Sequence, residues 1–134
     1  MNDILLLTHA GFASALWEIA VHIYGSPPEG VSLLEISSDS DIEQIRCRLG
    51  EKIRSMEPGK GLLILNDVYG ATPANLLQEW LAAECVMAIT GLNLPMFMRV
   101  LSRRNLPLAE MAQAGLAGAV AGIFLVGANI PARK

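Results

Sequence analysis

The sequence predicts an α/β fold with an open, mainly parallel sheet of about four strands and helices on both faces. Short apolar runs alternate with longer amphipathic stretches, and turn residues such as Gly, Pro and Asn separate them. Parallel strands need crossover connections, and these connections supply the covering helices. Because the 134 residues contain no internal repeat, low-complexity tract or linker, residues 1–134 are expected to form one domain.

The first half of the chain predicts two strands, each followed by a helix. In order, these are a strand over residues 4–8, a helix over 12–24, a strand over 31–36 and a helix over 41–56. Gly11 marks the turn into the first helix, whose apolar side chains recur at helical spacing. Asp39 or Ser40 is expected to cap the second helix, which has one apolar and one charged side.

The second half of the chain continues this alternation and ends in a further strand. In order, we expect a strand over residues 62–65, a helix from Thr72, a strand over 86–89, a helix over 94–102, a helix from Leu108 and a strand over 120–126. Thr72 before Pro73 is typical of a helix start. A capping hydroxyl is followed there by a residue whose missing N–H has no helical partner to lose.

Composition limits the class of protein. The formal net charge is -3, and the basic residues are scattered, without a run or a patch interleaved with aromatic residues. Nucleic acid and anionic membrane surfaces are therefore not expected partners. Cys47 and Cys85 lack the spacing of a disulfide framework or a zinc site. We expect no metal and no cofactor, and partners that are small molecules or proteins.

Two segments bear on localisation. The amino-terminal sequence lacks the basic lead, the longer apolar run and the cleavage site of a signal peptide, so we expect a cytoplasmic protein. Residues 111–132 carry no charge and are long enough to span a bilayer, which takes about 20 apolar residues. Their abundant Ala and Gly, with Gln113 and Asn129, fit a buried helix running into a strand, and we favour that interpretation.

Polar residues follow the strands that are expected to end at one edge of the sheet. In an open parallel sheet the loops after the strands form a crevice, where His9, Asp67 and residues 90–93 would meet. An Asp that accepts the N–H of one imidazole nitrogen leaves the other nitrogen as a nucleophile. A phosphoryl group on that nitrogen makes the ring cationic, and the nearby carboxylate stabilises the charge.

The same crevice is expected to supply hydrogen-bond donors for a phosphate. Helices that begin near Gly11 and Pro73 would direct free N–H groups and their positive dipole ends toward it. Gly70 and Ala71 would let the loop approach closely, and the Thr72 hydroxyl could donate directly. The predicted phosphate contacts are therefore Thr72, Gly70, Ala71 and Gly11.

Each of these residues also has a structural interpretation. A histidine at a strand end is often a hydrogen-bonded surface residue, so His9 alone indicates little. Asp67 fits a turn and Thr72 fits a helix cap equally well. The functional interpretation therefore depends on the three residues converging in one crevice.

Three segments carry a resemblance to a known family. They read LLLTHAGFASAL at residues 5–16, NDVYGATPANLL at 66–77 and TGLNLPMFMRVL at 90–101. In this order and spacing they resemble the mannose/fructose/sorbose-type IIA component (EIIA) of the bacterial phosphoenolpyruvate-dependent sugar phosphotransferase system (PTS). The resemblance covers nearly the whole chain. Ala10 departs from the glycine most often seen after the histidine, which affects the expected loop shape.

The resemblance implies a phosphotransferase function as a phosphohistidine carrier. His9 would accept a phosphoryl group at Nε2 from phosphohistidine on HPr and pass it to a IIB component for sugar uptake. Asp67 would hold the other ring nitrogen, and Thr72 would be the family's hydroxyl residue in the third-strand loop. Members are usually homodimers, in some of which the final strand crosses to the partner; here residues 120–126 would cross and cover an exposed sheet edge.

Two other functions remain open. The chain ends at Lys134 without the family's linker to a IIB unit, so we expect a standalone carrier. Such a carrier could equally be regulatory, with its phosphorylation state controlling a kinase or another regulator. A nucleotide- or flavin-binding flavodoxin-like module shares the architecture, but neither GxGxxG nor a Walker A pattern follows the first strand.

Overall fold

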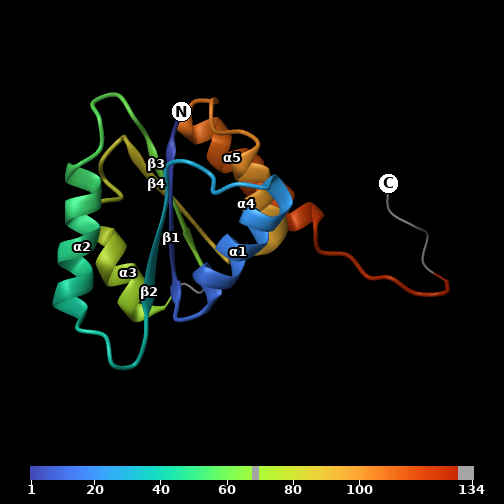
Figure 1. Cartoon of the computed structure of the whole chain (residues 1–134), viewed down its shortest axis with the longest axis horizontal. Helices are drawn as coiled ribbons and strands as arrows, with labels where there is room; N and C mark the ends of the chain where they lie inside the picture. The colour runs from blue at the N-terminus through green and yellow to red at the C-terminus, as the bar shows by residue number, and fades with distance from the viewer. Residues whose placement is uncertain (68–69, 130–134) are drawn as a thin grey trace.

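The computed structural model describes residues 1–67 and 70–129, and for residues 71–74 it describes the backbone alone. Strands and helices alternate along most of this part of the chain (Figure 1). In order, the elements are β1 (Asp3–His9), α1 (Phe12–Tyr24), β2 (Val31–Ile36), α2 (Ile42–Arg54), β3 (Leu62–Asn66), α3 (Ala71–Gln78), β4 (Val86–Thr90), α4 (Leu94–Leu101) and α5 (Leu108–Ala121).

The four strands form one parallel sheet in the order β2-β1-β3-β4. His9 pairs with Ile36 of β2, and Leu7 pairs with Asn66 of β3. The chain passes from β1 to β2 on one side and later adds β3 and β4 on the other. The central strands β1 and β3 therefore lead into connections that diverge, which opens a crevice at their carboxyl ends. The predicted α/β class and parallel sheet are confirmed.

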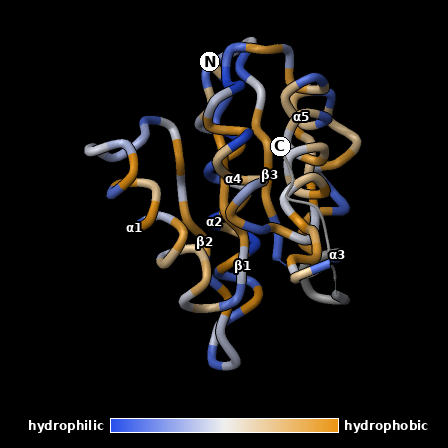
Figure 2. Tube along the Cα trace, turned by 90° about the vertical axis from the view of Figure 1, so that its right-hand side faces the viewer, coloured by the Kyte–Doolittle hydropathy of each residue, from blue (hydrophilic) through white to orange (hydrophobic). Residues whose placement is uncertain are grey.

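Alternating side chains on the central strands build two separate cores, one on each face of the sheet. Ile4 and Leu6 of β1 pack with the first core, and Leu5 and Leu7 pack with the second. Helices α1, α4 and α5 cover the first face, and α2 and α3 cover the second (Figure 1). Figure 2 shows hydrophobic residues along β3. Both faces of this sheet are buried, as parallel sheets require.

Two helix starts differ from the prediction. Helix α2 is capped by Asp41, whose carboxylate accepts a hydrogen bond from the Glu43 N–H at 3.0 Å. Asp39 and Ser40 do not cap it, because the chain first closes a turn in which the Ser40 N–H donates to the Ser37 carbonyl. Helix α3 begins at Ala71 with Gly70 as its N-cap, one residue before the predicted start.

The strand predicted over residues 120–126 is absent from the single chain. Helix α5 continues to Ala121, and the Gly122 N–H still bonds the Gly118 carbonyl at 3.0 Å. Residues 123–127 form neither helix nor strand and run away from the body of the protein (Figure 1). An apolar run becomes a strand only where a neighbouring strand pairs with it, and the sheet formed by the described residues consists of β2, β1, β3 and β4. Exchange with a partner chain stays a prediction.

Residues 111–132 also raised the question of a membrane span. Among residues 1–67 and 70–129, no helix is both long enough and apolar enough to cross a bilayer. Within the described part of this stretch, α5 contributes Met111, Ala112 and Ala119 to the first core and packs against β3 and β4.

Candidate functional site

The candidate site lies where β1 and β3 end. His9 is the last residue of β1, and Asp67 follows the last residue of β3. Both strands are buried up to this point, whereas the His9 side chain is 68% exposed. The sheet thus fixes the backbone of a histidine whose ring is open to solvent. The structure confirms that these two residues meet although they lie 58 positions apart in the sequence.

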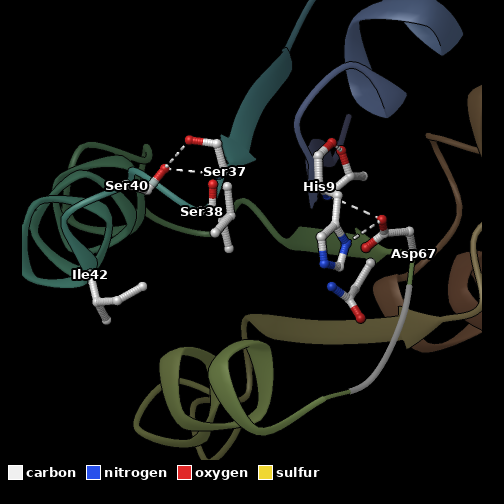
Figure 3. A pocket seen from close by; sticks show the side chains of 9 residues that line it. His9, Ser37, Ser38, Ser40, Ile42 and Asp67 are labelled. Carbon is white, nitrogen blue, oxygen red and sulfur yellow. Dashed lines mark hydrogen bonds and ion pairs between the residues drawn. The ribbon is translucent and has the colours of Figure 1, made fainter.

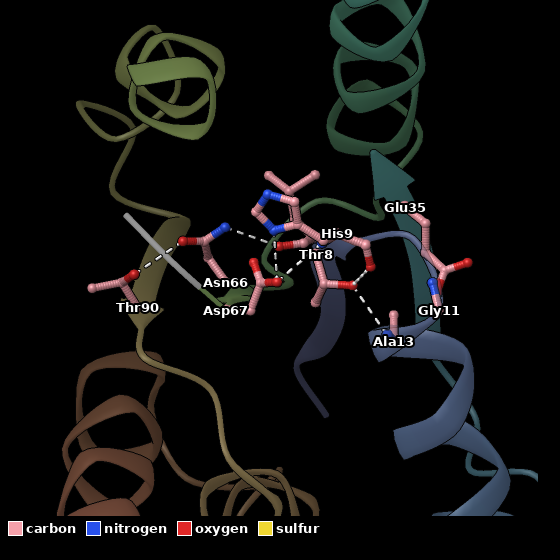
Figure 4. A network of polar contacts seen from close by, with 9 residues as sticks. Thr8, His9, Gly11, Ala13, Glu35, Asn66, Asp67 and Thr90 are labelled. Carbon is pink, nitrogen blue, oxygen red and sulfur yellow. Dashed lines mark hydrogen bonds and ion pairs between the residues drawn. The ribbon is translucent and has the colours of Figure 1, made fainter. Parts of the chain in front are cut away.

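One carboxylate oxygen of Asp67 receives two hydrogen bonds from His9. The backbone N–H of His9 donates to Asp67 Oδ2 at 3.1 Å, and the ring Nδ1 lies 2.9 Å from the same oxygen (Figure 4). A carboxylate can only accept here, so Nδ1 carries the proton and Nε2 presents its lone pair. Asp67 is only 8% exposed, which strengthens this charged contact. The two bonds fix the ring relative to its own backbone.

Buried polar groups below the pair hold the two strand ends together. Asn66 is 1% exposed; its amide donates to the Leu7 carbonyl at 3.0 Å and accepts from the Thr90 hydroxyl at 2.9 Å. The hydroxyl of Thr8 accepts from the Ala13 N–H at 3.0 Å (Figure 4). The ends of β1, β3 and β4 are therefore joined by side chains as well as by the sheet, and the His9–Asp67 geometry rests on a rigid base.

The exposed side of the His9 ring faces a cavity of about 450 Å³. Figure 3 shows the ring opposite a serine-rich turn that follows β2. Its lining residues are Thr8, His9, Ile36, Ser37, Ser38, Ser40, Ile42, Asn66 and Asp67. The wall is thus apolar and hydroxyl-bearing, and none of the described lining residues is Lys or Arg. A cavity of this size admits a side chain of a partner or a small molecule.

The four residues predicted to bind phosphate differ in how the structure places them. The Gly11 N–H already donates to Glu35 Oε2 at 2.9 Å, so contact with a phosphate would require that carboxylate to leave. Gly70 is the N-cap of α3 in an extended conformation, and Ala71 opens the helix. The side chain of Thr72 lies outside the described residues. Phosphate contacts by these four residues stay predictions.

Three further residues contribute to the site and were not predicted. Glu35 accepts hydrogen bonds at the start of α1, Asn66 ties the strand ends, and Ser38 lines the cavity. The available signal was a polar side chain at the end of an apolar strand for Asn66, and next to the end of a mostly apolar strand for Glu35. No comparable signal existed for Ser38, because its place opposite His9 depends on how the β2–α2 turn folds.

The fold and the His9–Asp67 pair define a doubly wound α/β protein with a carboxylate-held histidine at its switch point. The chain belongs to the EIIA-man family: the model described as PTS system fructose IIA component matches residues 3–114. Members of this family are components of the phosphotransferase system. The resemblance drawn from the three sequence segments is therefore confirmed. A search of curated protein sequences finds no significant match.

Solved structures share the fold at low sequence identity. The phosphotransferase component EIIA of Streptococcus agalactiae is 21% identical, with a TM-score of 0.81 over 92% of this chain and 96% of that one. The mannose/sorbose-specific IIA subunit of Enterococcus faecalis is 15% identical, with a TM-score of 0.83 over 99% and 98%. A sigma-54 interaction domain protein of E. faecalis is 14% identical, with a TM-score of 0.72 over 90% and 92%.

Proposed function

We propose that this chain is a phosphoryl carrier of a sugar phosphotransferase system, phosphorylated at Nε2 of His9. The observation that carries the proposal is the different bonding of the two ring nitrogens. Nδ1 is bonded to Asp67, while Nε2 has no partner among the described residues and lies on the cavity side of the ring (Figure 3). Family membership supplies the donor and acceptor classes, phospho-HPr and a IIB component.

The transfer step follows from this geometry. The lone pair of His9 Nε2 attacks the phosphorus of the donor's phosphohistidine, the new N–P bond forms and the donor's N–P bond breaks. The donor imidazole leaves with that electron pair as a neutral ring, so no proton has to move. His9 then carries a positive ring charge beside the Asp67 carboxylate, which stabilises it. In transfer to the acceptor, the acceptor's nucleophile attacks the phosphorus, the bond between His9 Nε2 and phosphorus breaks, and His9 returns to its neutral form.

Donors for the phosphoryl oxygens would come from the start of α3. Gly70 and Ala71 open that helix next to Asp67 in the chain, and the first backbone N–H groups of a helix favour an anion. The Thr72 hydroxyl belongs to the same segment and would add a side-chain donor. These contacts extend the proposal beyond the His9–Asp67 pair.

The test is phosphorylation in a purified system. We expect incubation with phosphoenolpyruvate, enzyme I and HPr to place an acid-labile phosphate on the wild-type protein. His9→Ala should abolish the label, and His22→Ala should retain it. His22 is a matched control because it is the chain's other histidine and lies exposed on α1. Label that persists in His9→Ala would refute the proposal.

The role of Asp67 has a separate test. Asp67→Ala removes the acceptor of both His9 hydrogen bonds, so the rate of phosphoryl uptake should fall while the protein stays folded. Uptake measured by rapid quench and folding measured by circular dichroism distinguish the two effects. Wild-type kinetics in Asp67→Ala would contradict the assigned role.

We also propose that the chain acts as a homodimer. Ile123, Leu125 and Val126 are 71%, 75% and 79% exposed in the single chain, which is unfavourable for a run of apolar side chains. Light scattering should give twice the 14.4 kDa chain mass, and a chain ending at Gly122 should be monomeric. A full-length monomer at working concentration would refute this part. The dimer would operate in the cytoplasm, without membrane insertion, where it could associate with a membrane sugar transporter.

A regulatory role is the second candidate. One observation favours it: the fold recurs in the sigma-54 interaction domain protein of E. faecalis. In that case the phosphorylation state of His9 would change the affinity for a kinase or another regulator. Pull-downs with phosphorylated and unphosphorylated protein separate the two roles, because recovery of a IIB component supports transport and recovery of a regulator alone supports regulation.

A further inference from the structure

Glu35 reaches from β2 to the start of α1, beside the turn that carries His9. Its Oε2 accepts hydrogen bonds from the Gly11 N–H at 2.9 Å and the Ser14 N–H at 3.0 Å. Its Oε1 accepts from the Ser14 hydroxyl at 2.9 Å. In the sheet, Glu35 pairs with Thr8, the residue before His9. Figure 4 shows Glu35 next to Gly11 on one side of the strand end and Asp67 on the other.

Helix α1 depends on this contact because it has no cap of its own. Its N-cap is Gly11, which has no side chain and adopts a left-handed conformation with φ of 93°. Uncapped amides in the first turn of a helix have no helical acceptors. Glu35 takes two of these N–H groups, and Thr8 takes a third, from Ala13. Two neighbouring strands therefore cap the helix.

The turn at residues 8–11 is held from both sides as a result. On the β2 side, the Ala10 N–H bonds the Ile36 carbonyl at 2.9 Å, and Gly11 is bonded to Glu35. On the β3 side, the His9 N–H and Nδ1 converge on Asp67. Gly11 is the flexible point between the strand and the helix. Without Glu35, the β2 side would keep the Ala10–Ile36 backbone bond, and the start of α1 would keep the Thr8–Ala13 bond, but Gly11 and Ser14 would lose their acceptor.

The ionisation of Glu35 agrees with this arrangement. The backbone N–H of Ser14 is the main cause of a lowered pKa of the Glu35 carboxyl, and partial desolvation opposes it. The Ser14 hydroxyl and the Gly11 N–H lower that pKa further. Glu35 is therefore a carboxylate at neutral pH, and its negative charge faces the positive end of the α1 dipole.

We propose that Glu35 is a positioning residue for His9. Its three hydrogen bonds fix the start of α1, which keeps the backbone N–H and Nδ1 of His9 directed at one oxygen of Asp67 and Nε2 directed into the cavity. The effect on phosphoryl transfer rests on the proposed function, whereas the effect on the ring can be measured in the unphosphorylated protein. The proposal and the function can therefore fail separately.

The experiment compares Glu35→Ala, Glu35→Gln and Ser14→Ala, with Glu18→Ala as the matched control. Glu18 is an exposed glutamate of the same helix, outside the site. Nitrogen-15 NMR of the His9 ring in unphosphorylated protein reports which ring nitrogen carries the proton. Uptake from phospho-HPr gives the second readout, and the amide spectrum reports folding.

We expect Glu35→Ala to lose the preference for a protonated Nδ1 and to slow uptake about tenfold, because a small misplacement of a reacting group is costly. Glu35→Gln keeps an acceptor oxygen in place and should restore most of both readouts. Ser14→Ala removes one bond and should shift the tautomer less, and Glu18→Ala should match the wild type. If Glu35→Ala does not fold, Ser14→Ala supplies the test.

Two results would overturn the proposal. The first is a folded Glu35→Ala, or failing that Ser14→Ala, with the wild-type ring tautomer. The second is a Glu35→Gln variant as impaired as Glu35→Ala, because the acceptor geometry would then be irrelevant. A wild-type protein that takes up no phosphate would refute the proposed function, yet the tautomer comparison would still decide the role of Glu35.

Discussion

The two ends of the sheet use charged and polar groups in opposite ways. At the amino end, Asp3 and Arg104 are 6% and 7% exposed, and the Arg104 guanidinium donates to the carbonyls of Asn2 and Glu29. Lys60 lies 3.1 Å from Asp3. At the carboxyl end, the His9 ring is 68% exposed and only one of its nitrogens is bonded to the described residues.

This difference separates stability from chemistry. Burial lowers the pKa of Arg104, and the charges of Asp3 and Glu29 counteract it, so the guanidinium stays tied to its partners. Such a group cannot be removed without leaving buried acceptors unpaired. His9 has an unbonded nitrogen that can react, and its removal leaves few buried groups behind. We therefore expect substitutions at the amino end to change folding and those at the carboxyl end to change transfer.

The largest effect should come from Arg104→Ala. Two backbone carbonyls lose their donor and Asp3 loses a buried counter-charge, so the free energy of unfolding should fall by about 3 kcal/mol. Urea denaturation measures this loss. Arg103→Ala is the control, because Arg103 is exposed and its guanidinium donates to the neighbouring Ser102. A loss below about 1 kcal/mol would place Arg104 among ordinary surface residues.

Asp67→Asn should produce the next largest effect, on transfer. The carboxamide oxygen can still accept from the His9 N–H and Nδ1, but the negative charge beside the phosphorylated ring is lost. We expect phosphoryl uptake to slow about tenfold or more, since about 1.4 kcal/mol of charge stabilisation corresponds to a factor of ten. The unfolding free energy should change little. Wild-type uptake in the Asp67→Asn variant would show that hydrogen bonding alone is sufficient.

Asn66→Ala should have an intermediate effect. It should lower both the stability and the rate of phosphoryl uptake, although Asn66 lies at the carboxyl end of the sheet. The Leu7 carbonyl loses its side-chain donor and the Thr90 hydroxyl its acceptor, so we expect a loss of about 1–2 kcal/mol in unfolding free energy. Uptake should also slow, because Asn66 joins the strand ends that position His9 and Asp67. Full stability with unchanged uptake would contradict the view that this buried amide supports the site.

The smallest effect should come from Lys52→Ala at the amino end. Lys52 lies 3.7 Å from Asp3 and is 27% exposed, so water screens the pair and Lys60 remains as a partner. We expect a loss of about 0.5 kcal/mol, decreasing with added salt. Denaturation at low and high ionic strength measures both. A loss comparable to that of Arg104→Ala would mean that the whole amino-end cluster acts as one unit.

The sequence predicted the elements wherever local pattern decides the structure. The bounds of α1 and β2 match the prediction, because helical spacing and turn residues are local signals. The strand over residues 120–126 was not found in the single chain, because strand formation needs a partner strand that no local pattern reveals. The cap of α2 is Asp41 and not the predicted Asp39 or Ser40, because the turn closed by Ser37 and Ser40 comes before the helix.

The site was predictable in its centre and not in its surroundings. His9 ends β1 and Asp67 follows β3, and these strands are neighbours in the sheet, so topology alone brings the two residues together. The role of Glu35 depends on its register opposite Thr8 and on a side chain that reaches the next helix. The sequence contains these residues but not their pairing, and single-sequence patterns do not encode register across strands.

The composition of the cavity wall has an energetic consequence for a carrier. No Lys or Arg stands among its described lining residues, so no fixed cation there would neutralise a phosphoryl group on His9. A site that bound its cargo with several ionic contacts would have to break them at each departure, which raises the barrier to release. On the proposed function, the phosphoryl group would be held mainly by its covalent bond to Nε2, and not by ionic contacts with the cavity wall. Because the proposed donor is also a phosphohistidine, loading would exchange one N–P bond for another, and the direction of transfer would depend on the concentrations of the phosphorylated and unphosphorylated partners.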